Sequence, residues 1–312
     1  MRSFSRRSLA LLALALASAL ISGPACLSSA DRSGPGGGEP EPFVPLPTPG
    51  PEPIGFFLAN FDRSLVQWSR YQLTSSSSKD LNTLRGLEHE MQERARKRSD
   101  ELVAVLESGA PVNRRIAAAA LGFTHDPLVL GPLLASLPDP DPELAQKTLL
   151  SLGVLALPET PLGGILQRLR NDPDAWTRNN AAFALLAIAR AGGRASELAE
   201  GCRTALADSE PGVRAQCAST LGVLADADSV KRLSELLCDE DNLVALAAAT
   251  SLARIGRQHA GQKGSVGRAL ASPLDGVRAD RRNHLLGALR WLAGQDLGAD
   301  AGPWLEWAHK LP

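Results

Sequence analysis

The sequence has few aromatic residues and no excess of charge of either sign. Phe, Trp and Tyr together make up only 4% of the 312 residues, and the formal net charge is -1. Such low aromatic content disfavours a β-sandwich or a large globular core, and it suits thin helices packed through Ala and Leu. A nucleic-acid-binding protein normally carries a strong basic excess or a basic stripe, so we expect no nucleic-acid partner.

A long hydrophobic run is also missing. The apolar run near the start, from Leu9 to Ile21, has 13 residues, whereas a membrane-spanning helix needs about 20. It follows a basic start with Arg2, Arg6 and Arg7 and precedes small residues, which is the layout of an export signal. We therefore expect residues 1–26 to be a cleaved leader and the protein to be exported. An uncleaved signal anchor is the alternative.

One of the four cysteines lies at the end of this segment. Cys26 comes after Gly23, Pro24 and Ala25, and this stretch resembles the lipobox of bacterial lipoproteins. The resemblance implies cleavage before Cys26 and a lipid on that cysteine. Gly23 and Pro24 depart from the usual pattern, so an ordinary cut near Ala25 or Ala30 remains open. Either route predicts a protein of the periplasm or cell envelope, whose membrane contact is confined to an N-terminal lipid or anchor.

Residues 27–53 are rich in proline and glycine. Proline fixes φ and has no amide donor, so neither a helix nor a central strand is expected there. We predict a disordered tether between the leader and the folded part of the chain.

The rest of the chain repeats one phrase. Copies begin at Asp139, Asp172, Asp208 and Asp239, with a looser copy at Ser272. Landmark leucines recur every 31 to 36 residues, at Leu121, Leu152, Leu185, Leu221, Leu252 and Leu285. In each phrase an Asp caps a helix whose apolar residues recur every four positions, as in Val213, Cys217 and Leu221. This period predicts an all-α fold, an α-α superhelix of antiparallel hairpins with short outer and longer inner helices.

The phrase at 208–226 resembles a HEAT-like repeat of the kind found in phycobilisome bilin lyases. The matching residues are Asp208, Pro211, Val213, Arg214, Ala218, Leu221 and Gly222. The resemblance covers about residues 111–293 and implies a helical solenoid. A single hairpin cannot cover its own apolar face, so neighbouring hairpins must stack and the ends need caps.

Residues 54–110 and 294–312 are the expected caps. Phe57, Phe61, Leu65 and Trp68 recur at helical spacing in the first, and residues 81–107 are expected to form one long charged helix after them. In the second, Trp304 and Trp307 follow a proline on a short helix. Large aromatic side chains are suited to closing the open end of a core.

Four arginines take the same place in the alignment of the phrases, Arg114, Arg178, Arg214 and Arg278. Stacked hairpins would bring them into line. They either pair with the aspartates of the turns, as a structural device, or form a stripe that binds an acidic partner surface. Ala145 and Ala245 interrupt the series.

Cys202 and Cys217 fall on opposite arms of one hairpin, at similar distances from its turn. An exported protein would permit a disulfide between them. Two free buried thiols are the alternative, because Cys217 also fits the apolar period of the core.

No pattern of catalytic residues stands out. HEAT-like deoxyhypusine hydroxylases hold two irons with His–Glu pairs in several repeats, whereas this chain has one such pair, His89–Glu90. We expect no metal and no cofactor. The sequence favours a non-enzymatic protein-protein interaction scaffold of the bacterial cell envelope, with its partner on the concave face of the array. The alternative is a lyase or other modifying enzyme on the same HEAT-like scaffold.

Overall fold

Helical hairpins follow one another along residues 52–74 and 77–311, the part of the chain that the computed structural model describes. These residues form fifteen α-helices and five short 3-10 helices, with no strand among them. The all-α prediction is therefore confirmed. The predicted leader, Cys26 and nearly all of the tether lie outside the described residues.

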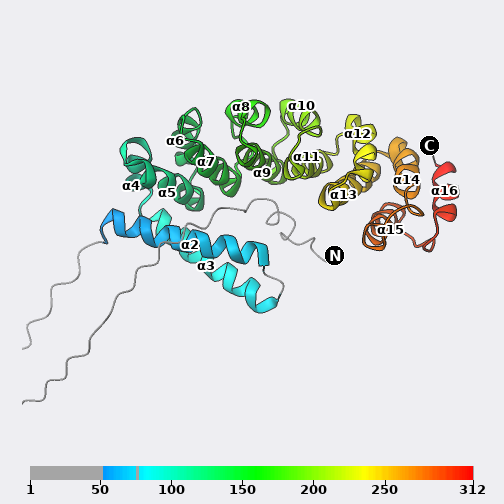
Figure 1. Cartoon of the computed structure of the whole chain (residues 1–312), viewed down its shortest axis with the longest axis horizontal. Coiled ribbons are helices and arrows are strands. Elements are labelled where there is room, and N and C mark those ends of the chain that lie inside the picture. The colour runs from blue at the N-terminus through cyan, green and yellow to red at the C-terminus, as the bar shows by residue number, and fades with distance from the viewer. Residues whose placement is uncertain (1–51, 75–76, 312) are drawn as a thin grey trace, which may run out of the picture.

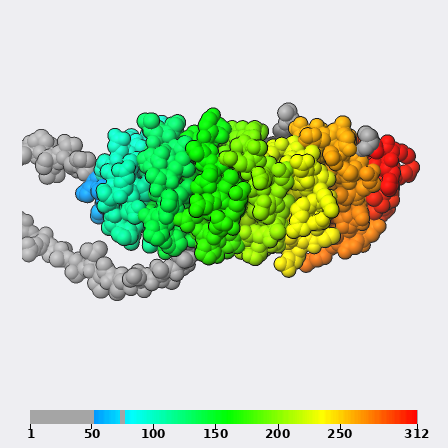
Figure 2. Space-filling model, turned by 90° about the horizontal axis from the view of Figure 1, so that it is seen from above, coloured from blue at the N-terminus to red at the C-terminus, as the bar shows by residue number. Residues whose placement is uncertain are grey.

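Six hairpins form an arch of two rows (Figure 1). The outer row, which lies along the top of the view, consists of α4 (Ser99–Ser108), α6 (Leu130–Ser136), α8 (Gly163–Asn171), α10 (Ser196–Ala205), α12 (Val230–Glu235) and α14 (Lys263–Ala271). The inner row consists of α5 (Pro111–Leu121), α7 (Pro142–Leu155), α9 (Ala175–Ala191), α11 (Pro211–Leu224), α13 (Asn242–Gln258) and α15 (Ala279–Ala293). The inner row lines the concave side, and the hairpins lie side by side in chain order (Figure 2). The structure is thus an α-solenoid.

The inner helices begin where the repeated aspartates lie. The side chains of Asp141, Asp174 and Asp241 accept backbone N–H groups in the first turns of α7, α9 and α13. These bonds satisfy donors that have no partner within the helix. Other inner helices begin with proline, whose missing N–H costs nothing at that position, as in α5 and α11.

The landmark leucines form the line of contact between the two rows. All six are at most 1% exposed, as are Val213 and Cys217. The glycine that follows a landmark leucine lies against the next inner helix. A Cβ on Gly222 would come within 2.7 Å of the Cα of Ser251, and Ser251 Oγ donates to the carbonyl oxygen of Ala218 at 2.8 Å. Small residues therefore let neighbouring inner helices approach closely.

An aromatic cluster closes the N-terminal end. Helices α2 (Ile54–Thr74) and α3 (Ser78–Arg96) form a hairpin that packs on α5. Phe57, Phe61 and Trp68 are buried as predicted, and the rings of Phe61 and Trp68 lie 5.8 and 5.3 Å from that of Phe123. The side chain of Arg98 lies over Phe57, with its guanidinium 4.9 Å from the ring centroid.

The single helix expected over residues 81–107 is wrong. The helix is interrupted at Lys97 and Arg98, between α3 and α4. Helix α4 then packs on α5 as the outer helix of the first hairpin, with Leu102 and Leu106 buried. No glycine or proline lies at this break. The change of direction instead lets α4 bury Leu102 and Leu106 against α5.

A short helix closes the C-terminal end. Helix α16 (Ala301–His309) packs on α14 with Trp304 fully buried. The indole N–H of Trp304 donates to the carbonyl oxygen of Gly298 at 3.0 Å, and its ring lies edge-on to Trp307. Both tryptophans lie on one short helix, as predicted.

The α2–α3 hairpin also lies under the start of the concave face, below α5 and α7 (Figure 1). Asp62 of α2 is close enough to Lys147 of α7 to raise the pKa of Lys147, although burial lowers it more. The hairpin thus lies below the N-terminal part of the concave face, with its far end below α9 in this view, while α11, α13 and α15 continue beyond it (Figure 1).

Candidate functional site

Three of the predicted arginines link successive hairpins. Arg114 donates to Asp139 at 2.8 Å, Arg178 to Asp208 at 2.8 Å, and Arg214 to Asp239 at 2.8 Å. In each pair the aspartate belongs to the turn of the following hairpin. Arg178 and Arg214 also donate to two backbone carbonyl oxygens of their own turns. We call these three pairs the arginine ladder.

The ladder aspartates are held in their charged form. Asp139, Asp208 and Asp239 each accept a second hydrogen bond, from the backbone N–H two residues further on. At Asp139 this backbone bond and Arg114 lower the pKa of the carboxyl. At Asp208 and Asp239 burial raises the pKa, but the arginine and the backbone donor outweigh it, and the net pKa lies below its usual value. The guanidiniums are thus engaged within the fold and are not a free stripe for a partner.

An arginine from the outer row fills one gap in the series. Where Ala145 stands, the next turn aspartate is Asp172, and Arg168 of α8 pairs with it at 2.8 Å. Arg168 also donates to the backbone carbonyl of Leu137 at 3.0 Å. It therefore joins two successive turns, as the ladder arginines do.

Arg278 does not share the position of the other three, so the alignment of the last phrase is wrong. It lies one residue before α15, its side chain is 92% exposed, and Asp280 is 3.8 Å away. The letters Gly-Val-Arg-Ala occur both at 212–215 and at 276–279, but the second copy lies before its helix begins. Arg282 takes the equivalent position in α15, and it donates to the carbonyl oxygen of Ala299 at 2.9 Å, next to the C-terminal cap.

Cys202 and Cys217 face each other across the α10–α11 hairpin as two free, buried thiols. The hydrogen bond with Cys202 and burial both raise the pKa of Cys217 well above its usual value. The predicted proximity is present, but the structure holds no disulfide there. Oxidation requires a thiolate, and this environment suppresses it.

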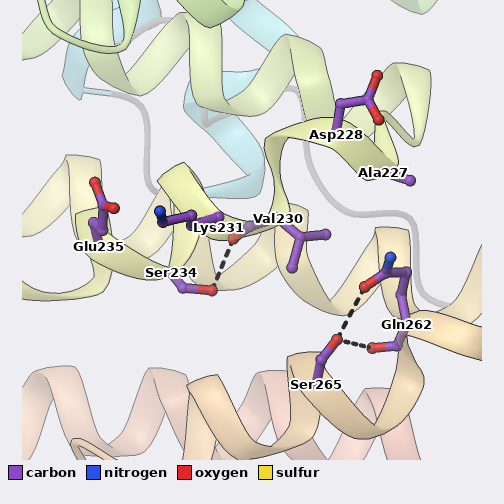
Figure 3. A pocket seen from close by; sticks show the side chains of 8 residues that line it. All are labelled: Ala227, Asp228, Val230, Lys231, Ser234, Glu235, Gln262 and Ser265. Carbon is purple, nitrogen blue, oxygen red and sulfur yellow. Dashed lines mark hydrogen bonds between the residues drawn. The ribbon is translucent and has the colours of Figure 1, made fainter. Parts of the chain in front are cut away.

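An open hollow lies on the outer face. It lies between α12 and α14, lined by Lys231, Ser234, Glu235, Gln262 and Ser265 among others (Figure 3). Ser234 and Ser265 both donate to backbone carbonyls of their own helical turns, at Val230 and Gln262. Their hydroxyls are thus engaged locally, and no histidine lies among the lining residues.

Within the described ranges, no three or more His, Cys, Asp and Glu side chains are grouped so that they could hold a metal ion. His89 is exposed on α3. None of the helices in the described part of the chain has the length and apolar character needed to cross a membrane.

Exposed apolar side chains occur on three of the inner helices, α9, α13 and α15. Trp176, Leu243 and Trp291 of α9, α13 and α15 are 40%, 39% and 40% exposed. With about 100° per residue, Trp176 and Leu243 lie roughly opposite the buried landmark leucines of their helices. That side of the inner row is the concave one. We call the concave side of α9, α11, α13 and α15 the open face.

A cluster of arginines lies on the open face at the other end of the inner helices. Arg190 is exposed, and its pKa is lowered by burial among surrounding protein atoms and by the charge of Arg254. On a concave surface a side chain such as Arg190 can be exposed to solvent and still have protein atoms on most sides. Arg257 stacks on Trp291, with its guanidinium 4.5 Å from the ring centroid. We call Arg190, Arg254, Arg257 and Trp291 the cationic cluster.

Sequence reasoning missed this cluster. A signal for part of it exists, because Arg190 and Arg257 each follow a landmark leucine by five residues. The five-residue step places them on the concave side, whereas the alignment followed the arginines near the turns.

Comparison with known proteins agrees with this architecture. A family model for HEAT repeats matches residues 199–280. No curated protein sequence matches the chain.

Solved structures that match the chain include human deoxyhypusine hydroxylase, at 22% identity over 78% of this chain and 92% of that one, with a TM-score of 0.37. The complex of CpcE and CpcF of phycocyanin lyase from a Nostoc species matches at 20% identity over 86% and 99%, with a TM-score of 0.39. An engineered protein matches at 20% identity over 76% and 98%, with a TM-score of 0.41. Residues 199–280 thus match HEAT repeats, and the described part of the chain is an α-solenoid of helical hairpins.

Proposed function

We propose that this chain is a non-enzymatic scaffold that binds a partner protein on the open face. The observation that supports this most is that the charged side chains near the turns are paired within the fold, whereas those on the concave side are exposed. The arginine ladder and the turn aspartates are used up in joining the hairpins, whereas Trp176, Leu243 and the cationic cluster are left at the surface of the concave side.

The dimensions of the open face suit a protein segment better than a small molecule. Trp176 and Arg190 lie fourteen residues apart on α9, about 21 Å along the helix axis at 1.5 Å per residue. Aromatic and arginine side chains are enriched among residues that dominate binding energy. A partner that spans the face would bury both ends of it.

The partner is tested by affinity purification of the tagged full-length chain from detergent-solubilised native membranes. We expect one partner at near-stoichiometric yield, and we expect the double variant Trp176→Ala, Leu243→Ala to lose it. Leu128→Ala is the matched control, because Leu128 is 83% exposed but lies in a short 3-10 helix before α6 in the outer row. An identical set of captured proteins for all three chains would contradict the proposal, as would turnover of a substrate.

We further propose that the protein is exported and held in the bacterial cell envelope by its N-terminal segment. The basic start, the apolar run and Cys26 support this. Radioactive palmitate labelling of the wild-type chain and of Cys26→Ala tests the lipid anchor. Label in the wild type alone supports it, and cytosolic fractionation of the unlabelled chain contradicts export.

A further inference from the structure

The open face contains two arginines that the fold does not neutralise. Among the described residues, neither Arg190 nor Arg254 makes an ion pair or a hydrogen bond, although most other arginines of the inner helices do. They come from α9 and α13, and they follow the buried landmark leucines Leu185 and Leu252 by five and two residues, which puts both on the concave side of their helices. Burial lowers the pKa of Arg190, and the positive charge of Arg254 lowers it further. Like charges held together without a carboxylate are unfavourable for the free protein.

The helix between them supplies no counter-charge. Helix α11 has 14 residues and the flanking α9 and α13 have 17 each. Asp226 follows the end of α11 but turns to the outer row, where its Oδ1 accepts from Arg203 of α10 at 2.8 Å. Helix α11 itself contains no acidic residue, and the carboxylate that follows it pairs with the outer row.

An aromatic surface borders the pair. Arg257 lies one helical turn after Arg254 on α13, stacks on Trp291 and donates to its carbonyl oxygen at 3.3 Å. Trp291 is 40% exposed. The cationic cluster thus offers two free guanidiniums beside an indole ring, a combination complementary to carboxylates next to an apolar side chain.

The geometry points to the cationic cluster as the docking site for an acidic protein segment, one that carries two neighbouring carboxylates beside an aromatic or aliphatic residue. The carboxylates meet Arg190 and Arg254, and the apolar residue packs on Trp291. This assignment rests on the proposed function, since it names the chemistry of the partner that the scaffold binds. Charge complementarity decides it, because a basic or neutral segment would leave the repulsion between the arginines in place.

The test uses the full chain and a fluorescent peptide of Gly-Glu-Glu-Phe repeats, with Gly-Gln-Gln-Phe repeats as the control peptide. Binding is followed by fluorescence anisotropy at about 0.05 M and about 0.5 M salt. We expect the acidic peptide to bind and the control peptide not to bind. The variant Arg190→Ala, Arg254→Ala should weaken binding about tenfold or more, and high salt should weaken it in the wild type.

The matched control is Arg232→Ala on the outer helix α12, where Arg232 is 46% exposed and pairs with Glu235. It removes one arginine charge from the opposite side and should leave peptide binding unchanged. Thermal unfolding should show that the double variant is at least as stable as the wild type, because removing unpaired like charges costs the fold nothing.

Three results would overturn the assignment. The first is that the acidic peptide does not bind, and the second is that it binds the Arg190→Ala, Arg254→Ala variant as tightly as the Arg232→Ala control. The third is that the affinity for the peptide rises when Glu39 and Glu41 are replaced by Gln, which would assign the site to the chain's own N-terminal segment. If the acidic peptide does not bind but capture of a partner still depends on Trp176 and Leu243, the acidic character of the partner is rejected and the scaffold proposal is retained.

Discussion

The same type of side chain has two different roles in this protein, and its partner decides which. Arg178 and Arg214 lie 13% and 10% exposed against aspartates of the next hairpin. The side chain of Arg190 makes no ion pair with any described residue, and the charge of Arg254 adds to the burial that lowers its pKa. A guanidinium has five N–H donors. Arg178 uses all five within the fold, and Arg214 uses four. Arginines of the first kind stabilise the stack, and those of the second kind are available for binding.

The three cysteines in the described part of the chain differ in burial, and we expect them to differ in reactivity for that reason. We expect iodoacetamide to alkylate Cys238, which is exposed, and to leave Cys202 and Cys217 unmodified in the native protein. Burial and the thiol pair raise the pKa of Cys217, so little thiolate forms near neutral pH. Peptide mapping after timed alkylation measures this, and all three should react in denaturant. A Cys202–Cys217 disulfide in protein from native membranes would contradict it.

At the scale of the helix, the close packing of neighbouring inner helices requires glycine, which has no side chain, at the contact. Gly222 of α11 lies against Ser251 of α13, and Gly153 of α7 lies against Phe183 of α9, where a Cβ would come within 2.3 Å of the ring. In the repeated Leu-Gly pair, the leucine faces the outer row and the glycine lets the next inner helix approach. Two consecutive residues thus serve two different contacts.

Replacing Gly222 by Ala should therefore lower the free energy of unfolding by about 1 to 3 kcal/mol, because the new methyl group overlaps the backbone of Ser251. Gly287→Ala is the matched control. Gly287 also lies inside an inner helix, but nothing is within 4 Å of its Cβ position, so the change should stabilise α15 by up to about 1 kcal/mol. Urea denaturation followed by circular dichroism measures both. Equal effects of the two variants would show that helix propensity, not close packing, decides them.

At the scale of the whole molecule, stability is a sum over hairpins and the contacts between neighbours. The arginine ladder places a charged pair at three of those junctions, and the aromatic caps close the two ends. Since each unit touches only its neighbours, loss of one junction weakens the array locally before the whole chain unfolds.

The ladder makes this stability depend on pH in the acid range. Asp139, Asp208 and Asp239 have a lowered pKa in the folded chain, so their contribution is fully present above the unfolded value of about 3.9 and is lost as the pH falls through the folded value. We expect the free energy of unfolding to change little between about pH 7 and pH 5 and to fall below about pH 4.

The variant Asp208→Asn should lose about 1 to 3 kcal/mol at pH 7, because the part-buried Arg178 loses its carboxylate. It should also show a smaller fall in stability on acidification. Glu159→Gln is the control, an exposed carboxylate in the loop after α7. Urea titrations at a series of pH values measure the effect, and an unchanged acid dependence in Asp208→Asn would assign it to other carboxylates.

Most of the architecture was determined by the sequence. The period of the landmark leucines and the aspartates that cap three of the inner helices depend on local residue order, since capping and amphipathic faces are properties of single helices. The aromatic caps were visible for the same reason. The break at Lys97 was not, because it follows from the packing of α4 on α5 and no local residue marks it.

The division of the arginines was decided only by the tertiary structure. Arg278 and Arg214 stand in identical four-residue stretches, yet one is exposed before its helix and the other is buried in a pair. The proximity of Arg190 and Arg254 joins residues 64 positions apart on different helices. Which charges are neutralised and which remain free depends on the stacking of hairpins, a contact between distant residues that no local pattern of the sequence contains.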